Sequence, residues 1–411
     1  MAAVAGLRGT GDWGTDERPK NFREMILFRN PNGSSPIFSL MARVQKESTN
    51  DPEFSWWDEP NDLVRLTVAG ALGTTDTTCV VDSVDPSATD ATRGNTWGVA
   101  SHLKPGDLLL VEPTADNATY DHEIIKVVSV SSDTSFTILR GQAGTTAAAI
   151  ANNALLTLIG SAYGEGTSEP AAASRNPIKY FNYTQIFKTS YEVTKSAAKT
   201  FARTGDILKN EKQRKAFDHS RAIELSLLYG QRNEGTDTNG KPLRTFDGIR
   251  KFIPSANTTV FGAATTASTF LDAVFPVFDW DSPAGDTRIA FCGNNGLNIL
   301  NKMIQTDSNT QMQFGGVIGQ FGMNFREFIL PQGRLLLRTH PLLNRHSLYR
   351  DSMFILDFSA LRWRPLRGRD TSFQDNIQNK GEDVIRGQWL TEAGLEVRAG
   401  GLTCGYLGAI Q

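Results

Sequence analysis

NPIKYFNYTQIFKTSYEVTKSA at residues 176–197 and DILKNEKQRKAFDHSRAIELSLLY at residues 206–229 are the two stretches that decide the fold. The first is rich in aromatic and β-branched residues, which favour extended strands. The second can be capped by Thr204 or Asp206 and predicts a helix about 36 Å long, at about 1.5 Å per residue. Its polar run KNEKQRK indicates that the first half lies on a solvated or intersubunit face. The second half carries a broken apolar stripe, with members at Ile207, Phe217, Ile223, Leu227 and Leu228.

A second aromatic stretch, EFSWWDEP at residues 53–60, has the same texture as residues 176–197. Between them, residues 61–166 contain few Lys and Arg, and short apolar runs alternate with turn residues. Strands are expected at residues 63–70, 77–84, 106–113, 122–131, 134–141 and 154–162. A compact barrel or sandwich is indicated by alternation at Leu108, Leu110, Ile124, Val128 and Val130. A β module between two extended strands predicts an insertion at the tip of a long hairpin.

The rest of the chain divides into an arm, an α/β region and late strands. Separated apolar anchors in the first 60 residues indicate an arm that docks on a neighbouring subunit or on its own chain. Residues 268–280 predict a helix broken at Pro276, residues 287–293 a buried strand, and residues 296–305 a second helix. Further strands are expected at residues 326–331, 333–341, 352–361, 361–366 and 387–410. The predicted fold class is α+β.

The bulk composition narrows the classes of protein. The 411 residues are 39% hydrophobic and 21% charged, which suits a globular chain with more than one core. A net charge of -2 provides no global basic field for nucleic acid. No apolar run approaches the roughly 20 residues that span a bilayer, and no signal-peptide layout is clear, so we expect a soluble protein. The cysteines lie far apart and are expected to be buried, inert thiols: Cys79, Cys292 and Cys404.

No constellation of residues predicts catalysis, a metal or a cofactor. The acidic run DWDSPAGD at residues 279–286 lacks the ligand order of a calcium loop and predicts a turn at a helix end. The glycine-rich residues 315–322 lack the strand and helix that flank a dinucleotide-binding loop. No GxSxG elbow or activated cysteine is present, so we expect a protein that is not an enzyme. Metal-ligand spacing is also absent among the histidines, which are His102, His122, His219, His340 and His346.

The order of arm, interrupted hairpin, long helix, α/β region and late strands resembles the Hong Kong 97-type fold of tailed-bacteriophage major capsid proteins. It is similar to the branch in which a β module is inserted into the E-loop. The likeness covers nearly the whole chain and lies in a series of segments rather than in one motif. These segments are SPIFSLMARVQKES with FSWWDEP, then KPGDLLLV with EIIKVVSVSSDTSFTILRGQAGTTAAAIANNALLTLIGSAYGEG, then KYFNYTQIFKTSYEVTKSA.

The resemblance implies a division of the chain into five parts. An N-terminal arm would occupy residues 1–45, and an E-loop residues 46–195 with a β-rich insertion at about 61–166. The spine helix of the peripheral domain would occupy residues 196–234 and the axial domain residues 235–335, in which residues 315–322 would form a flexible loop. Residues 336–411 would supply peripheral and axial strands that complete the fold.

The function that the resemblance implies is that of a major capsid protein. Many copies would assemble as hexamers and pentamers into an icosahedral head around double-stranded DNA. The portal, together with scaffolding or decoration proteins, would be a further partner. The expected location is the virion, after synthesis in the bacterial host cytoplasm, with no membrane and no cofactor involved.

Two sets of residues are candidates for contact in such a shell. Large aromatic side chains dominate interface energetics, so E-loop contacts are predicted at Phe54, Trp56, Trp57, Tyr180, Phe181, Tyr183 and Phe187. The alternative is that half of them pack within the hairpin. Arg pairs with carboxylates or phosphates, which predicts contact with neighbouring subunits or DNA at Arg362, Arg364, Arg367 and Arg369. We favour subunits, because a strongly basic wall would grip DNA nonspecifically. Solvated strand faces with ion pairs at the rim are the simpler alternative.

Two other functions remain open from the sequence. A phage tail-tube or baseplate protein would also be β-rich and oligomeric, but the long helix and the α/β region that follows it speak against this class. A secreted glycan-active enzyme would explain the β module and exposed aromatic residues. It would need a signal peptide and a convergent pair of carboxylates, and neither is clear in the sequence.

Overall fold

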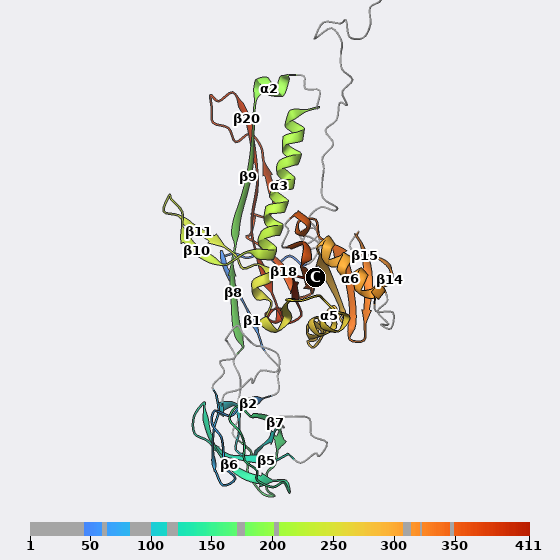
Figure 1. Ribbon diagram of the computed structural model, residues 1–411. Coiled ribbons are helices and arrows are strands. Elements are labelled where there is room, and N and C mark those ends of the chain that lie inside the picture. Colours follow the sequence, from blue (N-terminus) through green and yellow to red (C-terminus); the bar gives the residue numbers. More distant parts are fainter. Residues whose placement is uncertain are drawn as a thin grey trace, which may run out of the picture.

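The computed structural model describes residues 45–59, 64–82, 100–112, 122–170, 177–200, 205–306, 314–320, 323–345 and 349–411. Its mixture of helices and strands confirms the α+β class. Figure 1 shows a body built around one long helix, and a small β domain that lies beyond the end of a two-stranded ladder. Residues 1–44 of the predicted arm lie outside the described residues.

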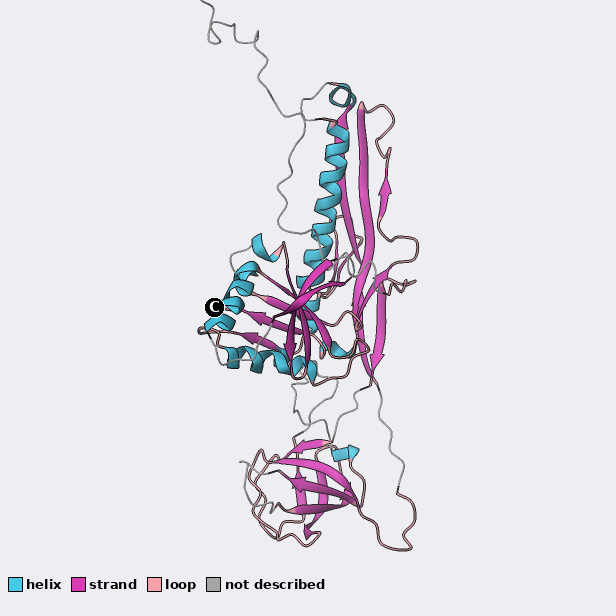
Figure 2. Cartoon of the chain, turned by 90° about the vertical axis from the view of Figure 1, so that its right-hand side faces the viewer, coloured by secondary structure: helices cyan, strands magenta, loops and turns pink. Residues whose placement is uncertain are grey.

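The two aromatic segments pair with each other, as predicted. β1 (Glu53–Asp58) runs antiparallel to β8 (Ile178–Tyr183) and forms the two-stranded ladder. The chain then continues as β9 (Gln185–Thr194), which pairs with the long strand β20 (Val384–Val397). β20 also pairs with β18 (Leu361–Pro365) and β19 (Ser372–Gln374). The elongated side of the molecule in Figure 2 is therefore built by strands that are far apart in the sequence.

The small β domain is a closed barrel, and all six strands expected there are present. The strand order is β2-β7-β4-β5-β6-β3, and a bridge between Val68 and Val81 joins the first strand to the last. Apolar side chains fill the interior, as they do in small barrels. The strands are β2 (Arg65–Thr67), β3 (Thr78–Val80), β4 (Asp107–Val111), β5 (Ile124–Val130), β6 (Ser135–Gln142) and β7 (Leu155–Ser161).

The side chains that form the barrel core are mostly not the ones whose alternation indicated a barrel in the sequence. On β4 and β5 the core is formed by their neighbours. Leu109, Ile125 and Val127 point inward, with exposed fractions of 0%, 0% and 1%. On the outer face, Leu108 lies opposite Lys126 and Leu110 lies opposite Ile124. The runs DLLLV and IIKVV are apolar at odd and even positions alike, so alternation does not reveal which set faces inward. Of the residues that indicated a barrel, Val130 packs against its core.

The predicted long helix is α3 (Ile207–Tyr229), with 23 residues. Asp206 caps it, because its side chain accepts hydrogen bonds from the backbone N–H groups of Leu208 and Lys209. The helix ends at Gly230, where the chain passes very close to another segment. A Cβ on Gly230 would lie 2.6 Å from the carbonyl oxygen of Phe246, so only glycine fits there.

Two buried polar contacts tie α3 to the sheets on either side of it. His219 forms hydrogen bonds with Thr189 of β9 and Thr391 of β20, at 3.1 and 2.8 Å. One turn further along, Glu224 contacts His340 at 3.0 Å, and both side chains are fully buried. These contacts fix the orientation of α3 about its own axis, because buried polar groups are almost always hydrogen-bonded and a rotated helix would lose these partners.

A seven-stranded mixed sheet forms the other half of the body, in the order β12-β21-β17-β13-β16-β15-β14. Its central strands are buried on both faces, which explains their continuous apolar sequences. Helices α5 (Ala267–Val274) and α6 (Asn294–Thr306) contribute to the core on one face. The strands are β12 (Thr258–Val260), β13 (Thr287–Cys292), β14 (Phe314–Gln320), β15 (Met323–Leu330), β16 (Gly333–Thr339), β17 (Met353–Leu356) and β21 (Gly405–Gly408).

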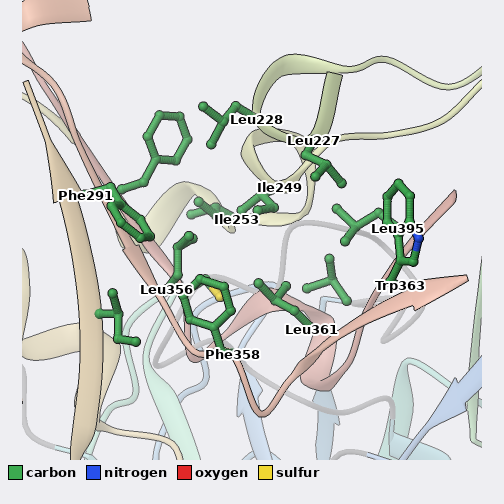
Figure 3. Packing of buried hydrophobic residues seen from close by; sticks show 14 of the residues in the cluster. Leu227, Leu228, Ile249, Ile253, Phe291, Leu356, Phe358, Leu361, Trp363 and Leu395 are labelled. Carbon is green, nitrogen blue, oxygen red and sulfur yellow. The ribbon is translucent and has the colours of Figure 1, made fainter. Parts of the chain in front are cut away.

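The core on the opposite face joins this sheet to α3. Leu227 and Leu228 of α3 and Ile249 of the short helix α4 (Ile249–Phe252) pack near Phe291 and Leu356 (Figure 3). The same cluster reaches β18 and β20 through Trp363 and Leu395. One continuous core therefore holds the helix, the seven-stranded sheet and the β9–β20 sheet together.

Most of the remaining expectations agree with the structure. α5 ends at Val274 and a 3-10 turn with Pro276 follows it, as predicted, and Gly285 adopts φ 64° in the predicted turn. The loop that the resemblance implied at residues 315–322 is wrong for residues 315–320, because Phe314–Gln320 forms strand β14, which pairs with β15, and residues 321 and 322 lie outside the described residues. Two short elements complete the description: α2 (Lys195–Lys199), and the hairpin of β10 (Asn233–Thr236) and β11 (Pro242–Thr245). None of the helices in the described ranges is long and apolar enough to cross a membrane.

Candidate assembly surfaces

The ladder of β1 and β8 separates the predicted aromatic residues into two faces. Side chains alternate along a strand, and Trp56 lies directly opposite Tyr180. Phe54 and Trp56 are buried, and Trp56 stacks on Tyr180 and approaches Phe252 of α4, with ring centroids 6.1 and 5.9 Å apart. This inner face attaches the ladder to the body of the same chain.

The outer face of the ladder carries Trp57, Phe181 and Tyr183. Trp57 is 62% exposed, which is unusual for so large an apolar side chain. Phe181 and Tyr183 meet edge to face with centroids 5.9 Å apart, and the guanidinium of Arg232 lies 3.8 Å from the centre of the Phe181 ring. Of these three rings, Trp57 is exposed to solvent, and Phe181 and Tyr183 are half-buried.

Phe187 lies apart from both faces of the ladder. It is buried on β9, where its ring contacts His219 of α3 and Phe246. The structure therefore brings Phe54, Trp56 and Tyr180 together on one face, and places Phe187 in the central core.

Asn182 fixes the angle at which the ladder leaves the body. Its side chain is fully buried, and its amide donates to the carbonyl oxygens of Asp247 and Leu395. Its amide oxygen accepts from the backbone N–H groups of Tyr183 and Asp247. The Asp247 carboxylate in turn accepts from the backbone N–H of Arg232. Because every one of these groups is paired, the base of the ladder is held rigidly.

Arg364 is the most strongly engaged of the four predicted arginines. Its guanidinium lies 2.7 Å from Glu47 and 3.2 Å from Glu396, and it lies over the ring of Phe54. The hydrogen bond from Arg364 lowers the pKa of Glu47. Lys46 pairs with Asp370 at 2.9 Å, and Lys46 and Thr49 form parallel bridges with the β18 segment. Arg364 therefore helps to anchor the chain where it emerges from residues 1–44.

The other three arginines differ in exposure. Arg362 is half-buried and donates to the carbonyl oxygens of Ser359 and Leu361, and burial lowers its pKa. Arg369 pairs with Glu392 at 2.6 Å. Arg367 is exposed, and its backbone N–H donates to the carbonyl of Thr49. Of the four, Arg367 thus has the guanidinium most accessible to a neighbouring molecule.

The carboxylates that pair with these arginines were missed in the sequence. Glu392 and Glu396 come from β20, and Glu47 comes from the far end of the chain. Alternation along β20 places Glu392 and Glu396 on one face of the strand, but only the pairing of β18 with β20 shows that they meet the arginines.

None of the three cysteine thiols is exposed to solvent. All three are free and buried, as predicted, and burial raises the pKa of Cys79 and of Cys404 to about 12. A thiol with so high a pKa is a poor nucleophile at neutral pH. Within the part of the chain that the structure describes, no group of three or more His, Cys, Asp or Glu side chains could hold a metal ion.

An elongated body, a ladder with the exposed Trp57 on its outer face and a barrel carried beyond that ladder are features that suit a structural subunit. The sequence identifies the family. Residues 6–407 match the model of the SU10 major capsid protein family, and this chain belongs to that family. It is a phage capsid component and thus a part of the virion. This membership decides against the tail-tube or baseplate alternative and against the glycan-active enzyme.

Individual relatives agree with the family. The major capsid protein of Pseudomonas phage PaMx41 is 27% identical over 394 residues, which cover 93% of this chain and 87% of the relative. Two solved capsid structures are similar at 10% identity, each over 98% of this chain and 99% of the other. They are the capsid of the native GTA particle, with a TM-score of 0.48, and the capsid of the Myoviridae phage XM1, with a TM-score of 0.45.

Proposed function

We propose that many copies of this chain assemble as hexamers and pentamers into an icosahedral head that encloses a double-stranded DNA genome. The observation that carries the proposal is membership of a major capsid protein family over nearly the whole chain. A closed shell requires each subunit to contact several neighbours, which suits a subunit with long extensions. The portal and scaffolding or decoration proteins are further proposed partners, and synthesis takes place in the bacterial host cytoplasm.

The proposal assigns a role to each part of the subunit. The ladder and the barrel belong to the E-loop of residues 46–195, with the barrel as its insertion, and residues 1–45 form the arm. α3 is the spine helix of the peripheral domain at residues 196–234. Residues 235–335 form the axial domain, which is completed by strands from residues 336–411. The order of these parts along the chain supports this division.

Contacts between subunits are proposed for the outer face of the ladder and for Arg367. Trp57 is exposed there and the half-buried Phe181 and Tyr183 share its face, whereas the inner rings are occupied by the chain's own packing. Glu396 and Glu392 of β20 already neutralise Arg364 and Arg369. The segment of residues 361–369 therefore presents less free positive charge than its sequence suggests. Pairing with a neighbouring subunit therefore suits this surface better than contact with DNA.

Negative-stain electron microscopy of the purified recombinant protein tests the proposed function. We expect closed shells, or separate hexamers and pentamers that form shells on concentration. Tubes or stacked rings would contradict the proposal in favour of a tail component. A protein that stays monomeric at all concentrations, with and without a scaffolding protein, would contradict self-assembly.

A further inference from the structure

The barrel carries an apolar surface that its own core does not use. We call it the outer apolar face, and define it by six residues of β4 to β7: Leu108, Leu110, Ile124, Val128, Leu139 and Ile159. Strand pairing places Leu110 opposite Ile124 on this side. Leu108 and Leu139 both lie opposite Lys126, and therefore share the same side. Leu139 is 49% exposed, whereas Leu108, Leu110 and Ile124 are half-buried, so the face is partly open to solvent in the single subunit.

Two irregularities in the strands add apolar residues to this surface. Ile159 is an extra residue in β7, because Leu158 and Gly160 lie opposite the adjacent residues Leu109 and Leu108. Val128 is likewise the extra residue between Val127 and Ser129 of β5. A β-bulge redirects the side chain of the extra residue. Both bulges leave a β-branched apolar side chain exposed, 50% for Ile159 and 43% for Val128.

The sequence of the strands also indicates burial on both sides. Strands that are apolar at odd and even positions are typical of sheets covered on both faces. Here the barrel core covers one face of β4 and β5, and the other face has a second apolar set that does not belong to that core and is half-buried or exposed. Connected exposed apolar residues mark an interaction surface. Because the barrel is closed, a partner must pack on side chains rather than extend the sheet.

Charge restricts the kind of partner. Lys126 is the charged side chain in the middle of this face, and it has no ion pair within the described residues. At the border, Arg65 and Glu112 already neutralise each other. A surface that binds DNA needs several free cations, so this face does not suit the genome. An apolar centre with a polar border is instead the usual composition of a protein interface.

We infer that the outer apolar face packs against a neighbouring copy of this chain in the assembled shell. The inference rests on the proposed function and names one of its contacts. The ladder holds the barrel beyond the body of its own subunit (Figures 1 and 2), so in a shell the barrel would extend into surroundings that other copies occupy. Burial of exposed Leu, Ile and Val side chains there stabilises the contact through the hydrophobic effect.

Thiol labelling of Leu139→Cys tests the inference, because the three native cysteines are buried and react slowly. The rate of maleimide labelling is measured in free subunits and in shells assembled from the purified chain alone. We expect labelling to be about tenfold slower in the shells, because reactivity follows exposure. Ser131→Cys, at the exposed turn between β5 and β6, is the matched control, and its rate is expected to change less.

The outcomes separate this inference from the proposed function. Equal labelling of Leu139→Cys in subunits and in shells would overturn the inference while the shell itself remains established. Protection that is seen only in complete virions, and not in shells of the pure chain, would assign the face to a different protein and overturn it as well. Failure to assemble any shell from the unmodified chain, with and without a scaffolding protein, would instead count against the proposed function.

A charge substitution supplies a second readout in the full chain. Val128→Asp and Leu139→Asp place a carboxylate on an exposed position, so the melting temperature of the free subunit should stay unchanged. We expect both variants to lower the yield of shells severalfold, because the carboxylate would be buried at the contact. Ser131→Asp adds the same charge at the turn and should assemble normally. Normal yields from both test variants would contradict the inference.

Discussion

Trp56 and Trp57 are neighbours in the sequence, yet they face opposite sides of the ladder. Trp56 is 8% exposed and stacks on Tyr180, whereas Trp57 is 62% exposed. We expect Trp56→Ala to reduce the free energy of unfolding of the subunit by about 3 kcal/mol, which is typical of a large-to-small change in a core. Trp57→Ala should leave that free energy nearly unchanged and lower the yield of shells. Urea unfolding and particle counts measure the two effects. Equal behaviour of the two variants would contradict the two-faced ladder.

Arg364 and Arg367 form a second matched pair, with one guanidinium engaged in the chain and one exposed. Arg364→Ala removes a partner from Glu47 and from the buried Glu396, so we expect a loss of about 2 kcal/mol in subunit stability. It should also expose the chain near residues 45–49 to protease. Arg367→Ala should affect assembly alone. Limited proteolysis and shell yield are the measurements, and normal shells from both variants would rule out a role for this strand in assembly.

At the residue scale, the sequence shows which aromatic and arginine side chains make contacts, but it does not show which residues of the same chain they contact. The aromatic residues of β1 and β8 were recognised, but alternation alone does not reveal that the face with Trp56 is the buried one. That choice depends on Phe252, which belongs to a helix distant in the sequence. The partners of the arginines were missed for the same reason, because Glu47 and Glu396 lie far from Arg364 along the chain.

Among the elements, α3 carries a buried histidine whose contacts depend on pH. Burial lowers the pKa of His219 below its ordinary value of 6.5, so the folded protein keeps the ring neutral between two threonines. The unfolded chain takes up the proton at higher pH than the folded chain does. The stability that these contacts provide is therefore complete above about pH 6.5 and is lost as the pH falls toward the lower pKa of the folded state.

We expect His219→Gln to make the free energy of unfolding less dependent on pH below about 6.5. Glutamine can bond to both threonine hydroxyls and does not titrate. The comparison uses urea unfolding of the unassembled subunit at a series of pH values. An unchanged slope in the variant would show that His219 does not contribute to the acid sensitivity of the helix.

At the element scale, most helices and strands follow from the sequence. The capped helix at Asp206, the helix that ends near Pro276 and the six barrel strands are all present where local patterns predicted them. Two features were not predictable from local patterns. β4 and β5 are apolar on both faces, so their inward side depends on barrel closure. Residues 314–320 form a strand because β15 pairs with them, although their glycines are poor strand formers.

For the whole molecule, we expect that the barrel can be removed without disturbing the ladder. Asp58 and Ile178 are directly paired, so an Asn-Gly turn in place of residues 59–177 would close β1 and β8 into a hairpin. The barrel has its own core, and the body should therefore keep its unfolding transition. We expect shells of this variant to dissociate at lower temperature than normal shells. Calorimetry of particles measures this, and an unchanged dissociation temperature would reject a bracing role for the barrel.

The order of ladder strand, β domain, second ladder strand, long helix, α/β region and late strands was predictable within the described residues, because these segments differ in composition. Their assembly in space was not, since the seven-stranded sheet combines β12 to β16 with β17 and β21 from the last part of the chain. The proposed contacts between subunits involve surfaces of the single chain, so they are argued from exposure and chemistry alone.

A cryo-electron microscopy reconstruction of shells assembled from the purified chain tests the central claim most directly. It would show where the outer face of the ladder, with Trp57, Phe181 and Tyr183, lies in the assembly. The account predicts an icosahedral shell in which the ladder and barrel of each subunit extend over an adjacent copy, with Trp57 buried in that contact. A shell in which the ladder contacts only its own subunit and Trp57 remains exposed to solvent would contradict it.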